Sequence, residues 1–204
     1  MILAIDTSTA ACTAALFDGG GACIARADEL IGRGHAERLA PMLDEMLAGR
    51  KADRILVGVG PGSFTGIRVG VAAAHGLAIG WGADLSGMSS LALVAASAET
   101  GEDVAAAMIG GHGELFVQQF DARLRPTTDL LNLSPEAAAS AVSAQFVAGP
   151  GAQALVDARG SGRAVDAWPS ASHALDVPES LRSLVPAPVY ARPPDAKVRS
   201  AAWF

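Results

Sequence analysis

Cysteine is scarce in this sequence: Cys12 and Cys23 are the only two among 204 residues, and neither lies in a CxxC or a cysteine/histidine spacing. This excludes a disulfide scaffold and a zinc finger. We expect both cysteines to be small buried side chains in strands, not paired with each other. Aromatic residues are also few, at 5% of the chain, so the helices and strands should pack closely around small side chains.

Positive charge is in deficit, with 15 lysines and arginines against 21 aspartates and glutamates, which gives a net charge of -6. Affinity for nucleic acid begins with clustered cations, so unassisted binding of nucleic acid is disfavoured. Half of the residues are hydrophobic and the mean hydropathy is +0.32, enough for one packed core or two small lobes. The composition is that of a globular chain rather than a disordered one.

The chain also lacks an uninterrupted apolar run long enough to span a membrane. The longest candidate, residues 64–81, is broken by Arg68, His75 and several glycines. The N-terminal residues include Asp6 and have no basic region before them, which is typical of a strand rather than a signal peptide. We therefore expect no membrane segment and a cytoplasmic location.

Hydrophobic spacing predicts an ordered series of elements in the first half of the chain. Three antiparallel strands come first, and helices then alternate with strands, so the series begins βββαβα and forms a mixed sheet. The first helix carries an apolar stripe that includes Leu39 and Met42. The predicted strands cover residues 2–8, 12–17, 22–28, 54–59 and 84–88, and the predicted helices cover 35–48, 64–80 and 89–98.

A polar run at residues 99–102 predicts a boundary between an N-terminal lobe, 1–100, and a reduced second lobe, 101–204. The second half repeats the strand and helix theme more weakly. Its final part is rich in proline, serine and alanine, and we expect an extended C-terminal arm over 186–194. The predicted elements are a hairpin of 104–109 and 115–120, a helix over 135–142 and a strand over 145–148.

A glycine loop, residues 60–63, lies between a predicted strand and the helix over 64–80, an arrangement that can bind an anion. The spacing matches neither GxxxxGK[ST] nor GxGxxG. A nucleotide phosphate stays open as the alternative, but a tight turn that lets the helix pack closely is favoured. Four glycines are assigned to this structural loop and helix start: Gly60, Gly62, Gly66 and Gly70.

Templates for hydrolysis and metal binding are missing from the sequence. No serine lies in GxSxG, and the four histidines form neither HxxxH nor HExxH. Asp6, at the end of the first predicted strand, has two interpretations. It holds a water or a metal near phosphates, or it forms an Asx turn that joins two strands.

The helix over 64–80 is apolar nearly all round, so it must be covered on more than one side. A helical wheel places small residues on one face, which predicts close packing inside the lobe. The opposite face holds Arg68, Val71, His75 and Ile79. We interpret that face as a surface for a partner, with burial in the same chain as the equally weighted alternative.

Several blocks of this sequence resemble the TsaB (YeaZ) family, the glycoprotease-like proteins of bacterial tRNA threonylcarbamoyladenosine synthesis. The most specific block is GVGPGSFTGIRVG. The resemblance implies a two-lobed α/β fold of the actin, Hsp70 and sugar kinase type (ASKHA), in agreement with the predicted order of elements. The blocks are IDTST at 5–9, RGHAERL at 33–39, GVGPGSFTGIRVG at 58–70 and PVYAR at 188–192.

The resemblance also implies a function. The family is similar to a shortened paralogue of the threonylcarbamoyltransferase TsaD, whose two metal-ligand histidines would fall at Ser90 and Val94 here. A valine cannot bind a metal. The chain is therefore expected to have no catalytic residue, metal or cofactor, and to act as a binding partner that activates TsaD. An ATP-dependent phosphotransferase of the same fold and a metallopeptidase are the disfavoured alternatives.

The same resemblance implies the partners. We expect a heterodimer with a TsaD-like transferase, a TsaE-like ATPase in a larger complex, contact with tRNA only through that complex, and a possible homodimer when the chain is alone. The first two helices of each N-terminal lobe would form a helical bundle. The residues expected to bind the partner are Arg68, Val71, His75 and Ile79, followed by Leu39 and Met42.

Overall fold

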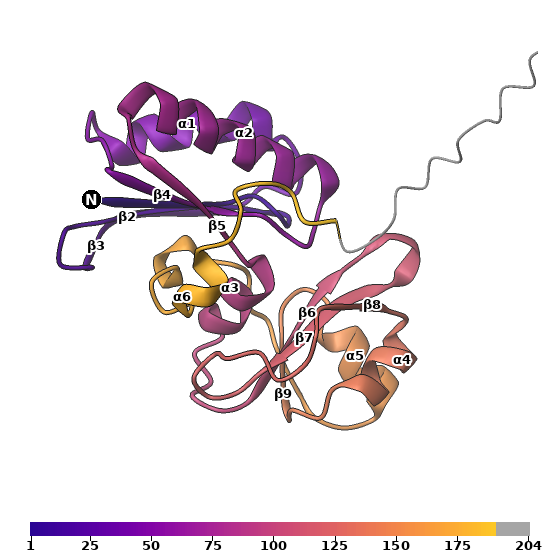
Figure 1. Ribbon diagram of the computed structural model, residues 1–204. Coiled ribbons are helices and arrows are strands. Elements are labelled where there is room, and N and C mark those ends of the chain that lie inside the picture. Colours follow the sequence, from indigo (N-terminus) through magenta and orange to yellow (C-terminus); the bar gives the residue numbers. More distant parts are fainter. Residues whose placement is uncertain (191–204) are drawn as a thin grey trace, which may run out of the picture.

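The computed structural model describes residues 1–190, which form two five-stranded mixed sheets with helices around them (Figure 1). In the first sheet the strand order is β3-β2-β1-β4-β5, with β1 antiparallel to β2 and parallel to β4. The elements of this part are β1 (Ile2–Asp6), β2 (Ala11–Phe17), β3 (Cys23–Leu30), α1 (His35–Leu47), β4 (Arg54–Gly58), α2 (Phe64–Trp81), β5 (Asp84–Met88) and α3 (Ser90–Ser97).

The second sheet repeats the topology of the first. Its order is β10-β9-β6-β7-β8, with β6 antiparallel to β7 and parallel to β9. The predicted fold class is therefore confirmed: the chain starts βββαβα, both sheets are mixed, and the arrangement is duplicated. The elements are β6 (Val104–Ile109), β7 (Leu115–Phe120), β8 (Leu131–Leu133), α4 (Pro135–Ala141), β9 (Phe146–Ala148), α5 (Ala152–Arg159), β10 (Arg163–Val165) and α6 (Glu179–Arg182), with short 3-10 turns at Gly111–Gly113 and Ala171–His173.

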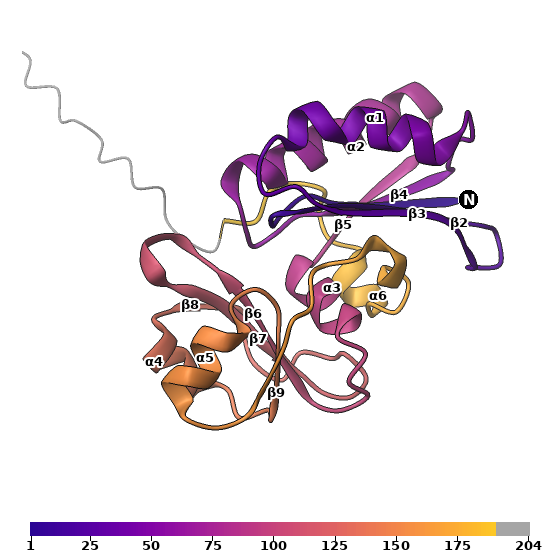
Figure 2. The ribbon, with the colours of Figure 1, turned by 180° about the vertical axis from the view of Figure 1, so that it is seen from behind.

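The sheets and helices form layers that are seen from both sides in Figures 1 and 2: α1 and α2 cover one face of the first sheet, and α3 lies between the two sheets. The alternation of side chains along β1 explains this layering. Leu3 and Ile5 pack with α1 and α2, whereas Ala4 packs in the cluster that contains α3 and reaches Phe120 of the second sheet. Both faces of β1 are thus buried, which is why the strand reads as a continuous apolar run.

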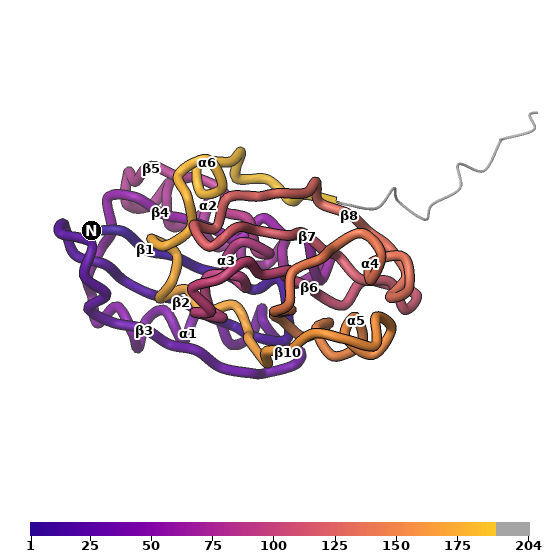
Figure 3. The backbone as a smooth tube through the Cα atoms, turned by 90° about the horizontal axis from the view of Figure 1, so that it is seen from below, coloured from indigo at the N-terminus to yellow at the C-terminus, as the bar shows by residue number. Residues whose placement is uncertain are grey.

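The C-terminal part of the chain returns to the first sheet after β10. The 3-10 turn Ala171–His173 packs against β2, α6 packs against β5, and Leu184 forms an antiparallel bridge with Gly87 of β5. Figure 3 shows this yellow segment lying beside the first sheet. The expected C-terminal arm is therefore packed on the molecule as far as Tyr190, and its remainder lies outside the described residues. The lobe boundary near residue 100 stays a prediction.

The two cysteines differ from each other in exposure. Cys12 is buried in β2 as expected, but Cys23 is exposed, so its predicted burial is wrong. Cys23 begins β3, which forms the edge of the first sheet and has an alternating, half-exposed pattern. Both thiols are free.

Candidate functional site

The turn between β1 and β2 contains a fully buried carboxylate, Asp6. Its Oδ1 accepts hydrogen bonds from the backbone N–H of Ser8 at 2.7 Å and from Ser8 Oγ at 2.6 Å. Its Oδ2 accepts a hydrogen bond from Ser90 Oγ at 2.6 Å. The turn is an Asx turn, the second of the two interpretations of Asp6, and its carboxylate is occupied by the protein's own donors.

This hydrogen-bond network joins three segments that are distant in the sequence. Ser90, at the start of α3, donates to Asp6 and also accepts a hydrogen bond from the backbone N–H of Gly60 at 3.2 Å. Ser89 caps the same helix by accepting from the N–H of Ala92. Ser90 thus ties the end of β1 to the glycine loop and to α3.

Burial and hydrogen bonding act in opposite directions on Asp6. Removal from water raises the pKa of the carboxyl, and the hydrogen bonds from Ser8 and Ser90 lower it. The net effect of the two is a raised pKa, because the side chain is fully buried.

The glycines of the loop and of α2 pack directly against the same turn. A Cβ at Gly66 would overlap the carbonyl oxygen of Thr7, and a Cβ at Gly62 would overlap that of Ser8. Thr7 Oγ1 donates a hydrogen bond to the Gly66 carbonyl at 2.7 Å, and the N–H of Ser63 donates to the Ser8 carbonyl at 2.7 Å. The loop and the start of α2 are therefore in direct contact with the turn, as the favoured interpretation of a tight turn with close helix packing requires.

The residues expected on the partner face do not all lie on the surface. Val71 is only 7% exposed and belongs to the core beneath α2, so for this residue the alternative interpretation, burial in the same chain, is correct. The core stripe of α2 is Ile67, Gly70, Val71 and Ala74, at helical spacing i, i+3, i+4 and i+7, whereas Gly80 is exposed. The helical face predicted from the small residues is therefore rotated relative to the face that packs in the core.

The two candidates on α1 are also buried. Leu39 is 2% exposed and Met42 is 1% exposed, and both pack in the core between α1 and the first sheet. An amphipathic helix of a globular domain turns its apolar stripe toward its own sheet, so that stripe cannot be offered to a partner without unfolding. The expectation that these two residues bind another protein is wrong on this ground.

Three of the candidates on α2 do lie on the surface: Arg68, His75 and Ile79, of which Ile79 is 84% exposed. Arg68 and His75 are in contact with the chain's own C-terminal residues. Arg68 Nε donates a hydrogen bond to Tyr190 Oη at 2.8 Å, and His75 Nε2 lies 3.0 Å from the Pro186 carbonyl oxygen. No signal in the sequence places Tyr190 of the PVYAR block beside α2.

A groove of about 510 Å³ runs between the C-terminal halves of α1 and α2. Its walls are largely apolar, and Trp81 and Leu77 contribute from α2 while Leu43 and Leu47 contribute from α1. No motif in the sequence indicates this groove, because the groove arises from the distance between two helices. The full lining is Ala40, Leu43, Asp44, Leu47, Gly49, Arg50, Lys51, Ala73, Gly76, Leu77 and Trp81.

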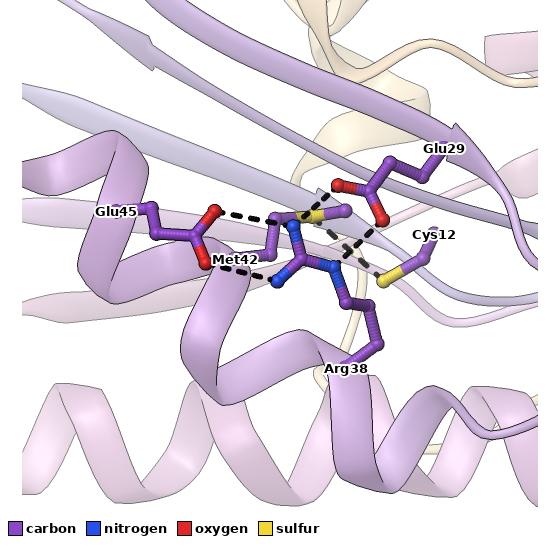
Figure 4. Close-up of polar contacts among 5 residues, drawn as sticks. All are labelled: Cys12, Glu29, Arg38, Met42 and Glu45. Atoms are coloured by element: carbon purple, nitrogen blue, oxygen red, sulfur yellow. Dashed lines mark hydrogen bonds and ion pairs between the residues drawn. The ribbon is translucent and has the colours of Figure 1, made fainter.

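A second polar cluster lies between α1 and β3 (Figure 4). The Arg38 guanidinium binds Glu29 of β3 with two hydrogen bonds, of 2.5 and 2.7 Å, and Glu45 of α1 with two more, of 3.1 and 3.2 Å. Arg38 lowers the pKa of both carboxyls. The cluster fastens α1 to the edge strand.

Cys12 lies next to this cluster, with its Sγ 3.9 Å from Met42 Sδ (Figure 4). Burial raises the pKa of the Cys12 thiol to about 11, so the sulfur is a neutral thiol at physiological pH. It is a packing residue rather than a nucleophile. Within residues 1–190 no group of three or more histidine, cysteine, aspartate or glutamate side chains is placed to hold a metal ion.

Comparisons with known proteins agree with this geometry. A family model described as TsaD, tRNA N6-adenosine threonylcarbamoyltransferase, matches residues 28–167. The solved structure of YeaZ from Pseudomonas aeruginosa is similar with a TM-score of 0.77 and 32% identity, over 93% of this chain and 98% of that one. The chain belongs to the TsaB (YeaZ) family.

Curated TsaB proteins are similar over a shorter region. The tRNA threonylcarbamoyladenosine biosynthesis protein TsaB of Haemophilus influenzae is 40% identical over 128 residues, which cover 58% of this chain and 52% of that protein. TsaB of Escherichia coli is 39% identical over 102 residues, which cover 48% and 43%. The chain thus spans about half the length of the curated relatives it matches. No helix among residues 1–190 is long and apolar enough to cross a membrane.

The packing of α2 on the β1–β2 turn predicts opposite effects for two alanine substitutions in one helix. Gly66→Ala should lower the free energy of unfolding by at least about 2 kcal/mol, because its Cβ overlaps the Thr7 carbonyl. Gly76→Ala is the matched control: nothing lies within 4 Å of its Cβ, so it should stabilise the protein by about 0.5–1 kcal/mol. Urea unfolding of the two variants and the wild type measures both changes in the free energy of unfolding. Equal stabilities would contradict the packing.

The raised pKa of Asp6 predicts a pH-dependent difference between the wild type and Asp6→Asn. The native carboxyl binds its proton more tightly than the unfolded one, whose pKa is near 3.8, so the wild type loses stability as the pH rises above that value. The variant has no such titration. Its free energy of unfolding should therefore increase relative to the wild type, by at most about 1.4 kcal/mol per pH unit, when urea unfolding is followed from pH 4 to pH 8.

Glu29→Gln provides a control with the opposite sign. Arg38 lowers the pKa of Glu29 below 4.5, so the wild type gains stability from this carboxylate above that pH and loses it as the pH falls. Relative to the wild type, Glu29→Gln should become less stable as the pH rises toward 4.5. A difference between Asp6→Asn and the wild type that is flat with pH would show that the Asp6 pKa is not raised.

Proposed function

We propose that this chain is a non-catalytic partner and activator of a TsaD-like transferase in the formation of N6-threonylcarbamoyladenosine in tRNA. Family membership and the role of the TsaB relatives in tRNA threonylcarbamoyladenosine biosynthesis support this proposal. A TsaE-like ATPase would join a larger complex, tRNA would be met through that complex, and the chain alone would form a homodimer. A complex that modifies tRNA would act in the cytoplasm.

The observation that carries the proposal is the environment of Ser90 and Val94. The resemblance to TsaD implies that the metal-ligand histidines of the paralogous transferase fall at these two positions. Here Val94 has no exposed surface and packs in the core around α3, and Ser90 is bound within the Asp6 network. Both positions serve packing and folding, and neither side chain offers a metal ligand of the expected type.

The outer face of the first two helices is the surface we assign to the transferase. It includes Ile79, which is 84% exposed, and the groove of about 510 Å³ between α1 and α2. Ile79 lies outside the groove lining, on the side of α2 that carries Arg68 and His75, and the groove has apolar walls on the α1 side. Each offers apolar surface to a partner's helix. Small residues on the groove wall, Ala40, Ala73 and Gly76, would let such a helix approach closely.

Metal analysis tests the non-catalytic assignment. The purified chain should contain far less than one equivalent of iron, zinc or any other transition metal by elemental mass spectrometry. It should also have no threonylcarbamoyl transfer, ATP hydrolysis or proteolytic activity when assayed without the transferase. About one equivalent of bound metal, or activity of the chain alone, would contradict the assignment.

The assignment of the partner surface is tested by Ile79→Asp. A charge buried against an apolar contact costs a few kcal/mol, so affinity for the TsaD-like transferase of the same cell should fall about a hundredfold, and threonylcarbamoyladenosine formation by the reconstituted system should fall with it. Calorimetric titration measures the binding. Val71→Asp is unsuitable as a test, because Val71 is in the core and its substitution would unfold the chain.

Leu30→Asp is the matched control for Ile79→Asp. Leu30 is 64% exposed at the end of β3, at the opposite edge of the sheet from β5, and is equally apolar. This variant should bind the transferase with wild-type affinity. If Ile79→Asp folds and binds as tightly as Leu30→Asp, the outer face of α2 is not the interface.

A further inference from the structure

The last described residues, 184–190, form a strap along the flank of α2, and the strap is held at both ends. At its start, Leu184 and Gly87 of β5 exchange two backbone hydrogen bonds, of 2.7 and 3.0 Å. Near its end, the N–H of Val189 donates to the carbonyl of Val59, directly after β4, at 2.8 Å. Backbone pairing at both ends gives the strap a defined position on the first sheet.

Two glycines leave room for the strap. A Cβ at Gly87 would lie 2.6 Å from the Val185 carbonyl oxygen, and a Cβ at Gly60 would lie 3.2 Å from that of Val189. Gly87 lies inside a regular strand and has no positive φ, so its own backbone does not require glycine. Its missing side chain allows the strap to approach β5.

Side chains of α2 hold the outer edge of the strap. The Arg68 guanidinium lies 3.6 Å from the centre of the Phe64 ring and 5.6 Å from that of Tyr190, and it donates to Tyr190 Oη. The two rings lie 5.3 Å apart. About two helical turns after Arg68 along α2, His75 contacts the Pro186 carbonyl. The strap therefore follows α2 from His75 back to Phe64.

The strap and α2 together concentrate the exposed apolar side chains of the described residues. Of the eight large hydrophobic residues exposed in residues 1–190, two lie on α2 and three on the strap. Neither segment contains an acidic residue, and Arg68 is the single arginine or lysine of the two. These five residues are Phe64, Ile79, Val185, Val189 and Tyr190.

We infer that the strap and α2 form one composite docking surface, and that its occupant is the transferase subunit. The inference rests on the proposed function. The strap is continuous with the α2 face assigned to that subunit, because it binds Arg68 and His75 of the same face. An apolar surface without acidic residues, in a chain of net charge -6, suits a protein partner with an apolar face. Residues 184–190 thus supply contacts that α2 alone does not have.

Val185→Asp tests the composite surface. Val185 is 76% exposed, so the substitution should leave the fold intact, which circular dichroism and thermal unfolding check. We expect its affinity for the TsaD-like transferase to fall at least tenfold, measured by calorimetric titration with the full chain. Leu30→Asp, which replaces another exposed apolar residue, on β3, should bind like the wild type.

The outcomes separate this inference from the proposed function. Wild-type affinity of Val185→Asp together with weak binding of Ile79→Asp would overturn the composite surface and leave the α2 interface in place. A wild-type chain that does not bind the transferase would overturn both. Hydrogen exchange of the wild-type chain is an independent measure: the Gly87 and Val189 amides should exchange more slowly when the transferase is added, and faster exchange would show that the partner displaces the strap.

Discussion

The rest of the N-terminal half depends on the contact of the glycine loop and α2 with the β1–β2 turn. This contact is possible because Gly62 and Gly66 have no side chains. It brings the Thr7 hydroxyl to the Gly66 carbonyl and the Ser63 N–H to the Ser8 carbonyl. The turn is then stiff enough to hold a buried carboxylate, and Asp6 in turn holds Ser90 at the start of α3. A buried charge or polar group is tolerated only when its partners are in place, so helix, turn and network stabilise one another.

This packing also determines what the glycine loop contacts. A strand, a glycine loop and a helix N-terminus can bind a phosphate when the loop faces open space. Here the chain's own turn lies against the loop, and the carboxylate at the end of β1 is bound by serines. The large exposed apolar residues of α2, Phe64 and Ile79, lie outside this contact.

The strap extends that outer surface. Arg68 and Tyr190 are separated by 122 residues, yet they meet because the chain crosses to the second sheet, returns past α6 and pairs with β5. The charge of Arg68 is neutralised by no carboxylate within the described residues. It lies instead over the Phe64 ring and beside the neighbouring Tyr190 ring, where a cation gains from the ring faces while both rings stay partly exposed to a partner.

Local patterns in the sequence determined most of the elements. Short apolar runs predicted β1 and β2, and the Leu39 and Met42 stripe predicted α1. The failed phosphate spacings and the glycines predicted a tight turn before α2. Short elements such as α5 and β10 were not predicted, because a few residues carry too little periodicity to distinguish helix from strand.

Tertiary structure alone decided which face of α2 is buried and what covers the rest. The helix is apolar nearly all round, so its sequence has no strong preferred direction, and the placement of Val71 depended on where the sheet lies. The same limit applies to Arg68 and His75, whose partners come from the C-terminal strap. Sequence periodicity reports the environment within a few helical turns, whereas the contacts of these residues arise from the path of the chain between two sheets.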